Sequence, residues 1–577
     1  MVSVANAVNV NPDGLGQVLI YPYYTARGEN DTLISVVNTS SQGKAAKVRF
    51  LEGLNSREVL DFNLYLSAFD VWTAAVTADG DGAKMITADS SCTVPYFFGA
   101  GGGGPDSFGE QKFLTFEFND DKEDGATTAE ERVASGYFEV IDMGTLVADT
   151  PEFSGGQFVG FSDVQDDSVL SPFGAEWAAT HAPVFDADGN PVVDNNGIQI
   201  RRPNDCESLV QAWSDVSIGQ RPASMFWTNS SGEQDVQPPT SGTLFGAASI
   251  INVNQGTMFS YNATAIDNFT QSRLHSVPGS VQPSLEDGAV LESNVFTTDT
   301  AGVATTTWGA SIDAVNAVLM NNRVINEYNI NRSLDAKTEW VLTFPTKRFH
   351  VDLDGGFGGT DLVENPDFDD GEPISDENPE FIEVAAARAP FSIPFDGSSC
   401  EPIGFNFWDR EERAVSEDQV VIRPVPSPRP PSDEAEIDVF NACFEANVIR
   451  FANAGEDTPD ASEILGEPRF TTFPLPTDFR SGWLRLGLDL ELLAAQFNET
   501  DLDALKEDLG LRPDARELTP PTQGPGNEGR TYAGLPSVGF RVTTFSNGNV
   551  ESDGQAVLSN YGGTFNHRGT RRFIVED

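Results

Sequence analysis

The chain has 577 residues and carries 88 acidic against 35 basic residues, a formal net charge of −53. Hydrophobic residues make up 39% and aromatic residues 10%, which allows a packed core and excludes a globally disordered chain. Nucleic-acid binding and docking on anionic lipid both need a basic surface, so the charge argues against either as the main function. Saline surroundings, calcium binding and plain solubility all remain open as reasons for the acidity.

The first 95 residues have the pattern of successive β-strands. Gly- and Asp-rich turns separate five segments rich in Val, Ile, Leu, Tyr and Phe: 17–25, 32–39, 44–52, 59–67 and 71–78. Strands at this spacing are typical of an antiparallel sandwich. We therefore predict a mainly β fold with an antiparallel, immunoglobulin-like β-sandwich core, large insertions and a few short helices.

The middle of the chain interrupts that pattern. We predict N-terminal sandwich strands in 1–95, an inserted β-rich region in 96–475, and C-terminal strands in 476–577 that return to complete the N-terminal sandwich. The inserted region is expected to contain one helix near 311–328, capped by Ser311, and an acidic loop at 352–383. Shorter helices are expected at 491–497 and 501–509.

The cysteines indicate an oxidising compartment. Their number is even and no C-x-x-C spacing occurs, so two structural disulfides explain them better than a zinc cluster, with four free thiols as the alternative. Of three possible pairings we expect the sequence-local one, Cys92–Cys206 and Cys400–Cys443. Ala5-Asn6-Ala7 has the A-x-A pattern that signal peptidase leaves, although no complete signal peptide precedes it. The sequence contains no run of 18 apolar residues, so no membrane-spanning segment is predicted.

Calcium is the cofactor that the acidic composition favours. Oxygen-bearing side chains alternate around a Gly in 186–194, without the Glu that ends an EF-hand loop, and a plain hairpin turn explains this segment equally well. The stretch 352–383 contains twelve acidic residues and no basic one, so it should be extended unless a metal neutralises it. The candidate metal ligands are Asp186, Asp188, Asn190, Asp194, Asp352, Asp354, Asp367, Asp369 and Asp370.

Both ends of the chain carry segments suited to contact another copy. Valines alternate with smaller or polar residues in 1–11, a pattern typical of a strand that is added to a neighbour's sheet, and three arginines form the densest basic cluster near the C-terminus. The predicted subunit contacts are Val2, Val4, Val8, Val10, Arg568, Arg571 and Arg572. The alternatives are a strand paired within its own chain, a remnant of a signal, and a solvated C-terminal tail.

Motifs of catalysis are missing. The four His are widely separated, and H-E-x-x-H, G-x-S-x-G and the P-loop do not occur. Carboxylates are too numerous to nominate the pair that a glycosidase needs. Eight Trp are available for sugar stacking, but the patterns around four of them predict core positions: Trp72, Trp227, Trp340 and Trp483. We therefore assign no catalytic residues and predict that the protein is not an enzyme.

Several phrases resemble those of uncharacterised secreted or cell-surface proteins of proteobacteria. They are GQVLIYPYYT (16–25), NDTLISVVNT (30–39), KVRFLEG (47–53), LDFNLYLSAFDVWTA (60–74), TEWVLTFPTK (338–347) and LSNYGGTFNHRG (558–569). The resemblance is spread over most of the chain. It implies export and brings no assigned activity, so no site residues are carried over from it.

These observations favour an exported structural surface protein that self-assembles into a filament or surface layer, with calcium as a candidate stabilising ion. The first alternative is a monomeric adhesin or glycan-binding module, followed by an unrecognised glycoside hydrolase and a virion structural protein. The expected partners are copies of the chain, with glycans or the cell envelope as the alternative, and neither nucleic acid nor membrane. The expected location is extracellular or at the cell surface.

Overall fold

The computed structural model describes fifteen segments of the chain. They are residues 7–97, 109–147, 152–154, 157–159, 174–214, 227, 236–297, 302–364, 381–414, 425–427, 440–521, 530–546, 550–552, 555–557 and 560–575. Within them, most of the regular structure consists of antiparallel strands. The prediction of a mainly β, antiparallel fold is confirmed.

The five predicted N-terminal strands are present within one or two residues of their expected bounds. They are β2 (Val18–Thr25), β3 (Asn30–Asn38), β4 (Lys44–Glu52), β5 (Glu58–Leu66) and β6 (Val71–Asp79). One sheet has the order β1-β18-β2-β10-β4-β5-β8 with β15 on β10, and the facing sheet has the order β17-β16-β3-β6-β7-β9. The added strands are β1 (Asn9–Val10), β7 (Gly82–Thr87), β8 (Cys92–Val94), β9 (Gly109–Lys112), β10 (Ser135–Leu146), β15 (Val236–Gln237), β16 (Leu244–Asn252), β17 (Thr257–Asn262) and β18 (Thr264–Asp267).

The immunoglobulin-like part of the fold prediction is not confirmed. Such a domain has seven to nine strands in two sheets, whereas these two sheets hold eight and six, and their last strands come from 236–267. The N-terminal sandwich is therefore completed by strands that lie beyond the predicted boundary at residue 95.

A second sandwich forms in the C-terminal half. One sheet has the order β28-β26-β31-β22-β39, and the other β27-β30-β29-β23-β35-β38. Only the β29–β30 pair among these neighbours is parallel. The strands are β22 (Arg323–Asn329), β23 (Ala336–Thr343), β26 (Glu401–Asp409), β27 (Val425–Ser427), β28 (Phe440–Ala442), β29 (Ala446–Asn453), β30 (Phe470–Leu475), β31 (Ser481–Gly487), β35 (Val538–Ser546), β38 (Asn560–Asn566) and β39 (Arg568–Thr570).

The strands after residue 476 thus lie elsewhere than predicted. We expected them to return to the N-terminal sandwich, but β31 pairs with β22 and β26, and β35 pairs with β23. The reason is that 320–475 already supplies strands with apolar faces, so the last strands find partners closer in sequence.

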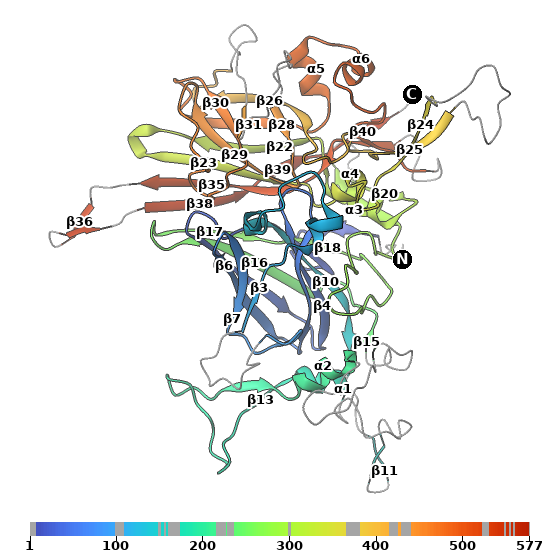
Figure 1. Cartoon of the computed structure of the whole chain (residues 1–577), viewed down its shortest axis with the longest axis vertical. Coiled ribbons are helices and arrows are strands. Elements are labelled where there is room, and N and C mark those ends of the chain that lie inside the picture. The colour runs from blue at the N-terminus through green and yellow to red at the C-terminus, as the bar shows by residue number, and fades with distance from the viewer. Residues whose placement is uncertain are drawn as a thin grey trace.

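The sheet that contains β23 is buried on both faces and joins the two sandwiches. Trp340 and Leu342 point into the C-terminal core, whereas Val341 belongs to the N-terminal core together with Phe540. The Phe540 ring stacks on Tyr261 of β17 with centroids 4.6 Å apart. Figure 1 shows the result: the C-terminal sandwich, in yellow-green to red, lies across one end of the blue and green N-terminal sandwich.

The helices are short and lie outside the sheets. They are α1 (Gly174–Ala179), α2 (Cys206–Trp213), α3 (Ser311–Leu319), α4 (Arg348–Val351), α5 (Glu491–Phe497) and α6 (Leu502–Asp508). The helix predicted for 311–328 ends at Leu319, because the residues from 323 onward alternate with period two and pair with β31. None of the described helices has both the length and the apolar composition to cross a membrane.

Small hairpins and pairs complete the described structure. They are β11 (Glu152–Ser154) with β12 (Gln157–Val159), β13 (His181–Pro183) with β14 (Arg201–Pro203), β19 (Glu292–Thr297) with β20 (Gly302–Thr307), β21 (Met320–Asn321) with β34 (Leu535–Pro536), β24 (Gly359–Glu364) with β25 (Phe381–Ala386), β33 (Arg530–Ala533) with β32 (Glu517–Leu518) and β40 (Arg572–Val575), and β36 (Val550–Ser552) with β37 (Gln555–Val557).

Candidate functional site

An open groove of about 590 Å³ lies at one corner of the C-terminal sandwich. One wall comes from β22 and β31 of the first sheet, and the other from β35 and β38 of the second. The loop that follows β26 closes one end with Arg410 and Glu412.

His567 fixes the corner between the two sheets, just after the groove residue Phe565. It lies between β38 and β39, at the point where the chain leaves one sheet and joins the other. Its Nε2 lies 2.9 Å from the carbonyl oxygen of Val341, and its Nδ1 lies 3.0 Å from the amide nitrogen of Asn326. These bonds require a neutral ring that donates from Nε2 and accepts at Nδ1. Burial lowers the pKa of His567 to about 4, which keeps the ring neutral at ordinary pH.

Aromatic side chains from four strands line the groove: Tyr328 of β22, Trp483 of β31, Phe545 of β35 and Phe565 of β38. Trp483 is 37% exposed and Phe565 is 57% exposed. The indole of Trp483 stacks on Trp408 with centroids 4.0 Å apart and planes 12° apart, which holds it in one orientation. The groove therefore presents preformed apolar surfaces to solvent.

One ion pair lies between the aromatic residues. Nη1 of Arg541 donates to Oε2 of Glu327 at 2.7 Å across the groove, and the guanidinium lies 4.5 Å from the centre of the Phe565 ring. Glu327 keeps 70% of its side chain exposed. Because the two charged groups are paired with each other, they do not act as a free acid or base. Arg541 can donate hydrogen bonds to a polar ligand, and Glu327 can accept them.

The predicted metal ligands near 186–194 form two hairpin turns. Asp186 accepts from the backbone N–H groups of Asp188 and Asn190, and Asp194 accepts from those of Asn196 and Ile198. Hydrogen bonds from the backbone, that of Asn190 first, lower the pKa of Asp186, and the bond from Ile198 does the same for Asp194. Both carboxylates thus cap their own turns, which matches the plain-turn alternative.

The acidic stretch 352–383 is described only in part. Asp352 accepts from Arg57 at 2.7 Å and from Arg348 at 3.1 Å, so its charge is neutralised by arginines and ties α4 to the N-terminal sandwich. Asp354 lies beside it in a turn, whereas Asp367, Asp369 and Asp370 fall outside the described residues. In the part of the chain that the structure describes, no three His, Cys, Asp or Glu side chains gather as a metal site would require.

Most of the predicted subunit-contact residues that the structure describes contact other parts of the same chain. Val8 is fully buried and bridges Ser293, and Val10 pairs with Ile266 in the N-terminal sheet. Arg571 donates to the carbonyl of Val318, Arg572 pairs with Glu491, and Arg568 remains exposed on β39. Val2 and Val4 are outside the described residues. The structure thus matches the alternative in which the N-terminal strand pairs within its own chain.

Both disulfides have the predicted pairing, Cys92–Cys206 and Cys400–Cys443. The first joins β8 of the N-terminal sandwich to the start of α2, and the second joins the start of β26 to the loop after β28. Two disulfides indicate a non-reducing environment.

Sequence reasoning missed the exposed side of β31. Trp72, Trp227 and Trp340 are buried as predicted, but Trp483 is not. The signal was present, because in Ser481–Gly487 the two leucines alternate with Trp483 and Arg485 and so face the opposite side of the sheet. Comparison of the chain with protein-family models, curated proteins and solved structures finds no match.

Proposed function

We propose that this chain is an exported glycan-binding or adhesin module that holds an extended saccharide in the groove at the corner of its C-terminal sandwich. The observation that carries the proposal is the exposed aromatic pair Trp483 and Phe565 beside the Glu327–Arg541 ion pair. The non-reducing environment that two disulfides require supports an extracellular or cell-surface location.

The chemistry of the groove suits a sugar chain. A pyranose ring has apolar C–H faces and a rim of hydroxyl groups, so it is bound by flat aromatic surfaces with a few fixed donors and acceptors nearby. The groove supplies both, and its open shape admits a chain that continues past either end. The stacked Trp408 keeps the Trp483 indole in place before binding, which lowers the entropy lost when the ligand is held.

The test is calorimetric titration of oligosaccharides with Trp483→Ala and with a matched control, Trp177→Ala. The probes are hexasaccharides of β-linked glucose, N-acetylglucosamine and hexuronate. Trp177 is also 37% exposed but lies on α1, at the opposite end of the molecule (Figure 1). We expect at least one probe to bind saturably, Trp483→Ala to weaken it about tenfold or more, and Trp177→Ala to bind normally. Equal loss in both variants, or no binding of any probe, contradicts the proposal.

Self-assembly is the second candidate, and a different surface favours it. The outer face of the sheet formed by β17, β16, β3 and β6 exposes the apolar side chains Leu33, Val71, Phe245 and Met258. Asp31 and Asp79 are the charged residues among the outward positions of these four strands. In a chain with a net charge of −53, two copies approach most easily where their surfaces carry few like charges.

Light scattering of the wild type and of Phe245→Asp tests that second candidate, with calcium and with a chelator. Val277→Asp, at a loop residue that is 49% exposed, is the control. Assembly through the sheet face predicts large particles for the wild type and the control and monomers for Phe245→Asp. A monomeric wild type in both conditions refutes self-assembly, and loss of particles in the chelator would assign calcium to the contacts.

A further inference from the structure

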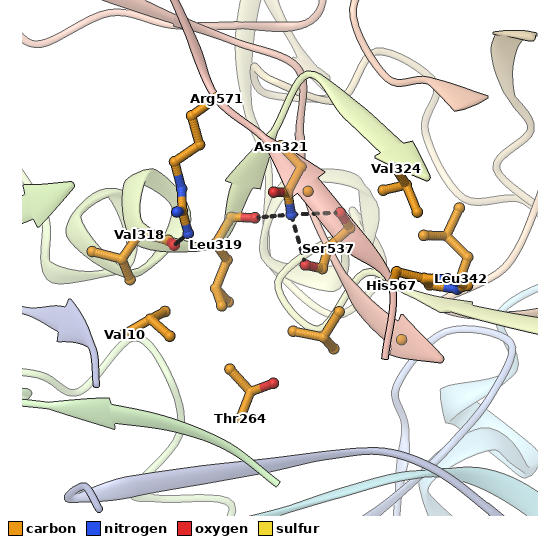
Figure 2. A pocket seen from close by; sticks show the side chains of 13 residues that line it. Val10, Thr264, Val318, Leu319, Asn321, Val324, Leu342, Ser537, His567 and Arg571 are labelled. Atoms are coloured by element: carbon orange, nitrogen blue, oxygen red, sulfur yellow. Dashed lines mark hydrogen bonds between the residues drawn. The ribbon is translucent and has the colours of Figure 1, made fainter. Parts of the chain in front are cut away.

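A second, smaller cavity lies between the two sandwiches. It has a volume of about 210 Å³ and is bounded by β1 and β18 of the N-terminal sandwich, the end of α3, and strands of the C-terminal sandwich (Figure 2). Cavities of about 150 Å³ accept a benzene molecule, so this one has room for a ligand of roughly six to ten non-hydrogen atoms.

Most of the cavity wall is aliphatic. Figure 2 shows Val10, Val318 and Leu319 on one side of it, with Val324 and Leu342 of the C-terminal sandwich on the other. The nearby amide of Asn321 is already used, since its nitrogen donates to the carbonyl groups of Leu319 and Ser537. The ring of His567 is also used on both nitrogens. These polar groups build the wall and leave little capacity for a ligand.

Arg571 is the exception. It follows β39, and its guanidinium reaches down beside Val318, where Nη2 donates to that residue's carbonyl oxygen at 2.9 Å (Figure 2). Nε is buried without a hydrogen bond, and among the described residues the charge influence on this guanidinium comes from the phenol of Tyr532 and not from a carboxylate. Burial lowers the pKa of Arg571, which is the direction expected for a cation that lacks a counter-charge.

An arginine without a counter-charge is unexpected in this chain. Acidic residues outnumber basic ones by 88 to 35, and the adjacent Arg572 contacts both Glu491 and Asp489. A mostly buried cation is costly unless an anion or several acceptors balance it. A carboxylate that entered the cavity would supply the missing charge, and the planar guanidinium is well suited to bind it with two parallel hydrogen bonds.

From this geometry we infer that the cavity is a binding site for a small aliphatic monocarboxylate. The carboxylate lies on Arg571, and the aliphatic part lies against Val10, Val318 and Leu319. The hydroxyl of Thr264, which also lines the cavity, is a further donor on the side of the N-terminal sandwich. Because residues of both sandwiches line the cavity, the bound ligand also stabilises their junction. This inference does not depend on the saccharide groove, which has different lining residues.

Thermal unfolding and calorimetry with straight-chain carboxylates of four to six carbons test the inference. The matching primary amides keep the shape and remove the charge, and sulfate and phosphate test whether any anion suffices. For the wild type we expect a raised Tm and saturable binding with a carboxylate, and at least tenfold weaker binding of its amide. Equal binding of amide and acid contradicts the site, and binding of inorganic anions alone contradicts the aliphatic part.

The variants are Arg571→Met, which keeps the aliphatic stem, and the control Arg568→Met, three residues earlier and exposed on β39. We expect Arg571→Met to lose the carboxylate response and Arg568→Met to keep it. Without ligand, Arg571→Met should unfold at the wild-type Tm or above, because it removes a partly buried charge without a counter-charge. If Arg571→Met is folded by circular dichroism and still binds the carboxylate normally, the inference is refuted.

Discussion

The two sandwiches are built from similar strands but differ in how much of their charged side chains is exposed to solvent. In the N-terminal sandwich Arg132 pairs with Glu52 and Asp124, and all three side chains are at most 1% exposed. In the C-terminal sandwich the Glu327–Arg541 pair spans an open groove, and Glu327 is 70% exposed. Paired charges thus form either a buried network or part of an open surface, depending on whether other parts of the chain cover them.

Because of that difference, we expect the N-terminal sandwich to contribute most to stability and the C-terminal sandwich to bind the ligand. Strands β4 and β10 are buried along their entire length, because other parts of the chain cover both faces of their sheet. The outer face of β31 is covered only in part, so its Trp483 reaches solvent. Substitutions in the first region should lower the free energy of unfolding, and substitutions in the second should change binding.

The largest effect is expected from the disulfide of the N-terminal sandwich. Replacing Cys92 and Cys206 together by Ser should lower the free energy of unfolding by about 5 kcal/mol, because the bond closes a loop with a sequence separation of 114. The Cys400–Cys443 bond has a separation of 43, so its removal should cost about 1 kcal/mol less. Urea unfolding under non-reducing conditions measures both. A larger loss for the C-terminal bond would contradict this order.

Removing Arg132 should be nearly as damaging. Arg132→Met leaves Glu52 and Asp124 buried without their shared partner, for which we expect a loss of about 3–5 kcal/mol in urea unfolding. The control is Arg332→Met, where an arginine that is 75% exposed pairs with Glu456 and the expected loss is below about 1 kcal/mol. Similar losses for the two variants would mean that burial does not set the strength of these pairs.

The pH dependence should report on the corner between the two sheets of the C-terminal sandwich, where His567 lies. The folded pKa of His567 is about 4 against an ordinary value of 6.5, so the unfolded chain takes up a proton first as the pH falls. The resulting loss of stability is absent above pH 6.5 and complete below about pH 4. It should reach about 2 kcal/mol, since the ring keeps some contact with water.

His567→Gln is the variant that isolates this effect. Gln keeps a nitrogen donor for the carbonyl of Val341 but does not titrate. The difference in unfolding free energy between wild type and variant should therefore change between pH 6.5 and 4 and stay constant above pH 6.5. A difference that is the same at every pH would show that His567 does not titrate in this range.

The smallest effect on stability is expected in the groove. Trp483→Ala should lower the free energy of unfolding by less than about 1 kcal/mol beyond the loss of its stacking on Trp408, because the indole is partly solvated already. Trp72→Ala, which removes a fully buried indole from the N-terminal core, should cost about 3–5 kcal/mol. Equal costs would place Trp483 in the core and remove the contrast between the two sandwiches.

Much of the local structure could be predicted from the sequence. The five N-terminal strands follow from their apolar composition and turns, and the cysteine pairing follows from chain proximity. The period-two alternation of Ser481–Gly487 also indicates that Trp483 faces solvent, whereas the apolar residues next to it favour a core position. The helix at 311–328 was predicted too long because helical spacing was extended into residues that a sheet recruits.

The sequence by itself determined the mainly β character, the five N-terminal strands and the chemistry of the side chains, because these depend on neighbours along the chain. Only the tertiary structure decided which strands pair, and hence that the last strands form a second sandwich. It also decided that Asp352 faces Arg57, that His567 forms a corner, and that Arg571 lies without a carboxylate among the described residues. These outcomes depend on contacts between segments hundreds of residues apart, where packing of apolar faces outweighs any local preference.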